Sequence, residues 1–214
     1  MAQAQAATTT IGESEIRLRP PWLVALLEIV SENLYEVWWY ARTWMELKRA
    51  RSDPSMHPVW HTLAMFVPIY GLFRLHAHYR VLNETAASAG ATDRTSPGLM
   101  VILAIVRGVA GAIAVSIAVS IIMPVMVDMV NAIAANPKAP PLTPTFVMPP
   151  SLLLLSLAGI AIGAWQLYRG QEVLNAYYVT RPAAPAPAVL TLEWVFVALF
   201  ALRFLSDLLQ YVRR

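Results

Sequence analysis

Five apolar blocks separated by polar stretches dominate the pattern of the chain. They cover residues 22–40, 59–73, 99–127, 149–168 and 190–209. Apolar blocks of about 20 residues are typical of helices that cross the hydrocarbon core of a membrane. No segment has the alternating pattern of about ten residues that marks a membrane strand. The sequence therefore predicts an all-α fold, an integral membrane helical bundle.

The blocks at 99–127 and 149–168 are the clearest transmembrane helices, and we expect them to form an antiparallel hairpin. Small residues recur in both, and they let another helix approach closely in lipid. The second of these helices is expected to continue through Tyr168 as far as Tyr178. The predicted packing positions are Ala104, Gly108, Ala112, Ser116, Ser120, Gly159 and Gly163.

The other three blocks either span or are re-entrant or interfacial. Block 59–73 is short for a span, and Pro68 and Gly71 can break it. Block 190–209 carries Arg203 and Asp207 at helical spacing, which fits either a buried pair or a surface helix.

Block 22–40 contains three carboxylates, Glu28, Glu32 and Glu36, each four residues apart. One continuous helix would place them on one face, where lipid contact is costly. The stripe either lies among headgroups or is buried and paired. We predict that at least one carboxylate pairs with a basic side chain; the candidates are Arg42, Arg74, Arg107 and Arg203. Arg107 itself either reaches the interface or is a buried pairing residue.

Composition supports the membrane interpretation. The chain is 57% hydrophobic and only 14% charged, whereas soluble domains carry about 25% charged residues. It has no cysteine, which excludes disulfides and thiolate metal sites. The net charge of +3 lies mostly between the apolar blocks, where it reports topology and not nucleic-acid binding.

Charge and composition also suggest a topology. Lys138 is the single basic residue of the Pro-rich loop 128–148, which predicts a non-cytoplasmic loop in a multi-pass protein of the inner (plasma) membrane. Residues 1–19 are predicted to be a disordered tail. Residues 20–214 then form a single membrane-embedded domain.

The four histidines lie between His57 and His78. His57 and His61 are four apart, a spacing that can place two metal ligands on one helical face. His76 and His78 could reach the same ion only if the chain folded back at Pro68. Interfacial histidines with structural contacts are the main interpretation, and a metal, haem or pigment ligand is the alternative. No cofactor is predicted.

A possible internal repeat relates two parts of the chain. With Gly71 aligned to Gly163, Val81-Leu82-Asn83 matches Val173-Leu174-Asn175. A weaker copy surrounds Trp38 and Trp44. Duplication is common in multi-helix membrane proteins.

The segment from Leu34 to Lys48, with Trp38-Trp39-Tyr40 and Glu46-Leu47-Lys48, resembles an uncharacterised bacterial multi-pass membrane family. Members carry a Tyr-x-x-Tyr-Trp-x-Tyr-x-x-x-Arg-Glu-Leu type of motif; here Met45 stands in place of the arginine and Glu36 in place of a glycine. The resemblance covers residues 22–84 and implies no activity.

The sequence contains no hydrolase, zinc-protease or phosphate-loop motif. We therefore expect a non-catalytic membrane protein that acts through helix packing, as an accessory or scaffolding subunit, with other membrane subunits or a second copy as partner. A small transporter or channel, and a metal- or tetrapyrrole-binding membrane protein, are the alternatives.

Overall fold

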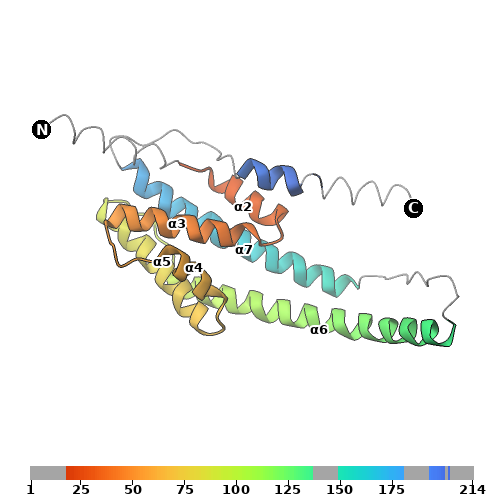
Figure 1. Cartoon of the computed structure of the whole chain (residues 1–214). Helices are drawn as coiled ribbons and strands as arrows, with labels where there is room; N and C mark the ends of the chain where they lie inside the picture. The colour runs from red at the N-terminus through yellow and green to blue at the C-terminus, as the bar shows by residue number, and fades with distance from the viewer. Residues whose placement is uncertain (1–17, 137–148, 181–192, 201, 203–214) are drawn as a thin grey trace, which may run out of the picture.

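The computed structural model describes residues 18–136, 149–180, 193–200 and 202, and all regular structure within them is helical (Figure 1). The elements in chain order are α2 (Pro21–Val30), α3 (Tyr35–Arg51), α4 (Pro58–Leu63), the 3₁₀ turn η1 (Ala64–Phe66), α5 (Tyr70–Ser88), α6 (Pro97–Ala135) and α7 (Pro150–Val179). Residues 193–200 form a further helical segment. The predicted all-α class is confirmed.

Proline marks the start of four of these helices. Pro21, Pro58, Pro97 and Pro150 occupy the first turns of α2, α4, α6 and α7. This position suits proline because its missing N–H would have no helical partner there and its φ is already helical. At α6 the Ser96 hydroxyl also accepts a hydrogen bond from the Leu99 N–H, at 3.3 Å. The helix starts are thus encoded locally.

The molecule has two regions, which we call the head and the hairpin. The head comprises α2, α3, α4, η1 and α5, packed around residues 97–107 of α6 and 163–179 of α7, and it holds the aromatic core. The hairpin comprises residues 108–135 and 150–162, which extend beyond the head (Figure 1). Gln166 joins α7 to α6 inside the head through a hydrogen bond to the Met100 carbonyl, at 2.8 Å.

Two helices, α6 and α7, are long and apolar enough to cross a membrane. Only 6% of the most apolar stretch of α6 is buried, and 28% of that of α7, so neither stretch is covered as a core helix would be. α7 continues to Val179 as predicted. α6 passes through Pro124 and ends at Ala135, so the predicted loop 128–148 begins too early, and its residues 137–148 lie outside the described residues.

The prediction of one helix over residues 22–40 is wrong. α2 ends at Val30, and Glu32 and Asn33 adopt positive φ angles of 51° and 74° before α3 begins at Tyr35. The Ser31 hydroxyl accepts a hydrogen bond from the Tyr35 N–H at 2.9 Å and so helps to start the new helix. Glu28, Glu32 and Glu36 therefore do not form one helical stripe.

The second block does break near Pro68. η1 ends at Phe66, Ile69 has a φ of 65°, and α5 begins at Tyr70. Gly71 is required here, because a Cβ at this position would lie 2.2 Å from the Met65 carbonyl oxygen. The turn folds η1 back against α5, and α4 packs against α3.

The boundary of the predicted disordered tail also needs correction. Arg19, within the predicted tail 1–19, is 1% exposed and belongs to the core of the head. Residues 1–17, Arg203 and Asp207 lie outside the described residues.

Candidate functional site: two buried charge networks

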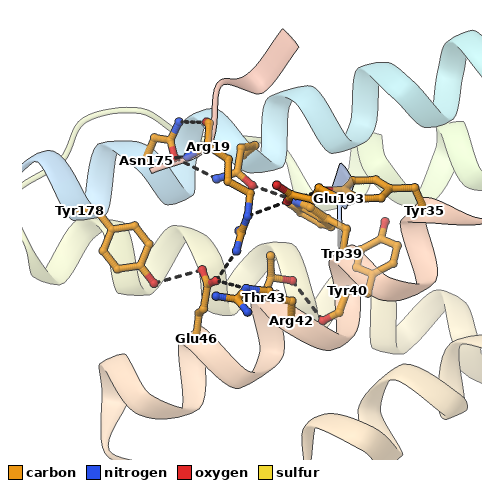
Figure 2. A network of polar contacts seen from close by, with 11 residues as sticks. Arg19, Tyr35, Trp39, Tyr40, Arg42, Thr43, Glu46, Asn175, Tyr178 and Glu193 are labelled. Carbon is orange, nitrogen blue, oxygen red and sulfur yellow. Dashed lines mark hydrogen bonds and ion pairs between the residues drawn. The ribbon is translucent and has the colours of Figure 1, made fainter. Parts of the chain in front are cut away.

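The first network is centred on Arg19, which enters the head just before α2 (Figure 2). Its Nη2 lies 2.9 Å from Oε1 of Glu46 on α3, and its Nε lies 3.0 Å from Oε1 of Glu193. Arg42 also contacts Glu46, at 3.0 Å. Two arginines thus face two carboxylates, and we call this set the Arg19 network.

Neutral donors complete the Arg19 network. Tyr178 donates a hydrogen bond to Glu46 at 3.2 Å, and Tyr35 donates one to Glu193 at 3.0 Å. Burial and the Glu193 charge raise the pKa of Tyr35, so its phenol keeps the proton that it donates. The Arg19 guanidinium lies over the Trp38 ring, 5.6 Å from its centroid. Each buried carboxylate therefore has both a cation and a hydroxyl partner.

An amide chain ties the Arg19 network to α7. The Trp39 indole donates to Gln171 at 2.9 Å, and Gln171 donates to Asn175 at the same distance. Asn175 then accepts from the Arg19 backbone N–H at 3.4 Å and donates to the Arg19 carbonyl at 2.6 Å. Asn175 thus binds both polar groups of the Arg19 backbone, ahead of α2.

Asn83 makes the same pair of bonds elsewhere. It accepts from the Thr95 N–H at 3.0 Å and donates to the Thr95 carbonyl at 2.7 Å. Thr95 and Arg19 each stand two residues before a proline that starts a helix, Pro97 and Pro21. The aligned asparagines of the possible repeat thus make equivalent contacts, and duplication itself stays a prediction.

The second network surrounds Arg107, where the hairpin leaves the head. Its Nη2 lies 2.5 Å from Oε1 of Glu36, and its Nη1 lies 3.9 Å from Oε1 of Glu28. The structure therefore brings together three of the residues proposed for charge pairing, although Glu28 and Glu36 come from different helices. Glu32 lies in the turn between α2 and α3. We call these residues, with Asn33 and Gly163, the Arg107 network.

Glu28 is the exceptional member of the Arg107 network. Its side chain is 0% exposed, and neither of its oxygens has a hydrogen bond of ordinary geometry within the described residues. Burial and the Glu36 charge raise the pKa of Glu28 to about 8, against the smaller lowering effects of Arg107 and the Glu36 backbone N–H. One arginine here faces two carboxylates.

Gly163 makes space for this network. A Cβ on Gly163 would lie 2.5 Å from Nη1 of Arg107, 2.9 Å from Oε1 of Glu28 and 3.0 Å from Oδ1 of Asn33. The three polar groups thus converge on one point of α7. Gly159, one turn away, lies against the Arg107 stem, with 3.6 Å to Cγ.

A cavity of about 250 Å³ adjoins the Arg107 network. Its polar lining comes from Glu36, Arg107, Tyr40, Thr62 and Gln166. The turn at residues 65–69 supplies much of the apolar wall, with exposed Phe66 and Ile69 beside it. The cavity can admit a small polar or charged group to the ion pair.

His61 contacts both Arg74 and His57. The Arg74 guanidinium lies 3.2 Å from Nε2 of His61, and because arginine only donates, this nitrogen acts as an acceptor. His57 contacts the same Nε2 through its backbone N–H, at 3.4 Å. His76 is exposed. Among the described residues, no group of three or more histidine, aspartate or glutamate side chains is placed to hold a metal ion.

His78 lies in an aromatic cage. The rings of Trp39, Tyr40, Trp44 and Tyr79 surround it with centroid distances of 4.9–5.6 Å. Its Nε2 lies 3.3 Å from the Thr43 hydroxyl, and burial lowers the pKa of His78 to about 3. A neutral imidazole therefore packs here as part of the core.

The predicted small-residue stripe of α6 divides between two environments. Ala104 packs against the core of the head, whereas Gly108, Ala112, Ser116 and Ser120 are exposed. Arg107, whose stem lies against Gly159 of α7, and the buried Ala114 are seven residues apart and share one side of α6, and Ala112 lies about 200° around the helix from Ala114. The exposed part of the stripe thus points away from α7.

Sequence reasoning missed most of the Arg19 network. Arg19 precedes two prolines in a polar stretch, and its partners Glu46, Asn175 and Glu193 lie far away in the chain. The match of Asn83 to Asn175 in the possible repeat is the one sequence signal that points to Asn175, and it does not identify Arg19 as the partner. No protein-family profile, no curated protein and no solved structure matches the chain.

Proposed function

We propose that this is a non-catalytic integral membrane protein that is anchored by the α6–α7 hairpin and acts through helix packing. In this proposal it serves as an accessory or scaffolding subunit of a larger membrane complex. The observation that carries the proposal is the uncovered side of α6. Gly108, Ala112, Ser116 and Ser120 lie opposite the α7-facing side and are exposed in the chain. Small residues at that spacing suit the close approach of a helix from another subunit.

Substitution on α6 tests the proposal. Ala112→Leu and Ser116→Leu would hold a partner helix away, and Ile113→Leu is the matched control about a quarter turn around the helix. After purification in mild detergent, we expect the first two variants to lose co-migrating subunits or self-association, while the control retains them. If all three variants kept their co-migrating subunits or their self-association, packing at this stripe of small residues would be contradicted.

The topology is tested with single cysteines, since the chain has none of its own. We propose that the connection between α6 and α7 is non-cytoplasmic and that the head faces the cytoplasm. Cysteines at Ala139 and Ser88 should then react with an impermeant reagent from opposite sides of the inner membrane. Labelling of both positions from one side would contradict the arrangement.

A small transporter is the second candidate, and the cavity beside Glu36 and Arg107 favours it. A protein that purifies alone and moves an ion in liposomes would support this candidate over the scaffold. A visible absorption band or a stoichiometric metal would instead support a cofactor-binding protein.

A further inference from the structure

The Arg107 network contains a buried carboxylate that its neighbours do not neutralise. Arg107 is closer to Glu36, at 2.5 Å, than to Glu28, at 3.9 Å. Nη1 of Arg107, both oxygens of Glu28 and Oδ1 of Asn33 have no hydrogen bond of ordinary geometry within the described residues. Nη1 of Arg107 is the charged donor on this side, but at 3.9 Å it makes no hydrogen bond to Glu28. A buried carboxylate without hydrogen bonds costs far more than a protonated one.

A proton on Glu28 removes the buried charge and gives this carboxyl group a donor of its own. Oε1 of Glu28 and Oδ1 of Asn33 lie 2.9 and 3.0 Å from the same point, the Cβ position of Gly163. Two acceptors that face one place are satisfied when one of them gains a proton and donates to the other. A metal ion fits less well, because the Arg107 guanidinium repels it and a hard cation takes six or more oxygens.

We propose that Glu28 is a proton-binding site, in which a neutral carboxylic acid is held against Asn33 over Gly163 and exchanges its proton with the cavity beside Glu36. Loss of the proton leaves two carboxylates for one arginine. Arg107 then divides between Glu28 and Glu36, and since Arg107 and Glu36 line the cavity, the cavity becomes more negative. This inference does not rest on the scaffolding function.

Every packed element contributes to the surroundings of Glu28. α6 supplies Arg107, α3 supplies Glu36, and α5 supplies Tyr79. α7 supplies Gly163 and Gln166, which do not titrate. The pKa of Glu28 rises to about 8 from an ordinary 4.5, so between these values the folded chain holds a proton that the unfolded chain has released. Folding stability therefore falls as the pH rises through this window.

The first test is the melting temperature in detergent between about pH 5 and about pH 9. We expect the wild-type protein to lose thermal stability as the pH rises, and Glu28→Gln, which is permanently neutral, to lose less. Glu84→Gln is the matched control, because Glu84 is half exposed and paired with Arg51 and Arg80. The control should follow the wild type. Parallel profiles for wild type and Glu28→Gln would overturn the proposal.

A lower melting temperature for Glu28→Gln at every pH would also overturn it. That result means that Glu28 is an anion bound by Arg107, with the Asn33 amide turned to donate its N–H. Specific stabilisation by Na⁺ over a bulky organic cation at alkaline pH, absent in Glu28→Gln, would place a metal ion in the site instead of a proton.

Infrared spectroscopy gives a readout that is independent of stability. The wild-type protein at neutral pH should show the carbonyl band of a protonated carboxylic acid, and this band should disappear at alkaline pH. Glu28→Gln should lack the band, whereas Glu84→Gln should retain it. The wild-type spectrum alone decides the matter if Glu28→Gln does not fold, since absence of the band at neutral pH overturns the proposal.

Discussion

The Arg19 and Arg107 networks both set arginine against two carboxylates in a buried place, but they differ in what completes them. In the Arg19 network Arg42 adds a second cation, and Tyr35 and Tyr178 donate to the carboxylates. In the Arg107 network one cation serves Glu28 and Glu36, and Glu28 has no comparable donor. A balanced set of charges fixes a fold, whereas an unbalanced set leaves one group able to change its protonation state.

The location of each network fits this difference. The Arg19 network joins α3, α7 and the chain ahead of α2 inside the head (Figure 2). The Arg107 network stands where the hairpin leaves the head and borders a cavity. Removing a charged partner should therefore lower the unfolding free energy most in the Arg19 network.

The largest expected effect is that of Arg19→Gln. It removes the cation that Glu46 and Glu193 share, and breaking such a buried pair costs about 3–5 kcal/mol of unfolding free energy, even though Glu46 keeps Arg42 and Glu193 keeps the Tyr35 hydroxyl. Unfolding in detergent measures the loss. Arg42→Gln is the control, because its side chain is 19% exposed and Glu46 keeps Arg19. A loss for Arg19→Gln no larger than that of the control would remove the contrast between the networks.

Glu36→Gln should cost less, about 1.5–3 kcal/mol, the value of a hydrogen bond to a charged group. Arg107 loses its nearest carboxylate, but Glu28 can ionise and replace it. The double variant with Glu28→Gln removes this substitute, so its cost should exceed the sum of the two single effects. Simple additivity in a double-mutant cycle would show that Glu28 does not compensate.

Asn175→Ala and Asn83→Ala each remove two hydrogen bonds to the backbone, and Asn175→Ala also removes the acceptor of the Gln171 amide. We expect about 1–2 kcal/mol for each, with the larger loss at Asn175 because it holds Arg19. The difference in unfolding free energy reports how much of the Arg19 network depends on the position of the backbone. Equal losses would mean that Arg19 is held by its ion pairs alone.

The smallest effect is expected for Glu84→Gln. Its contacts with Arg51 at 3.0 Å and Arg80 at 3.6 Å are exposed to solvent, and such pairs contribute about 0–1 kcal/mol. The unfolding free energy of this variant sets the baseline for the two buried networks. A cost that reaches the value for Glu36→Gln would mean that burial does not distinguish these pairs.

The sequence predicted the features that depend on neighbouring residues. The helical class, the continuation of α7 to Val179 and the break near Pro68 follow from apolar length and proline chemistry. The apolar pattern of block 22–40 predicts one helix, whereas the structure places a turn at Ser31 to Leu34. Ser31 and Asn33 are turn-forming residues that argued for the break.

The networks were less accessible to sequence reasoning because their members meet only in three dimensions. Arg107 was a candidate partner for the carboxylates of block 22–40, but its choice among four arginines depends on how α3 and α6 pack. Arg19 had no local signal at all, since its partners are 27 and 156 residues away. The pattern of hydrophobic and polar residues cannot show which polar side chains the folded chain buries.

The two hydrogen bonds between the Asn175 side chain and the Arg19 backbone have a consequence for biosynthesis. A ribosome adds about 5–20 residues per second, so an interval of roughly 8–30 seconds separates the synthesis of the two partners, 156 residues apart. The equivalent hydrogen bonds of Asn83 join residues that are only 12 apart in the chain, so they can form almost at once. The chain ahead of α2 is therefore fixed only after α7 has been made, and a nascent chain stalled before α7 would expose α2 to proteases and to chaperones.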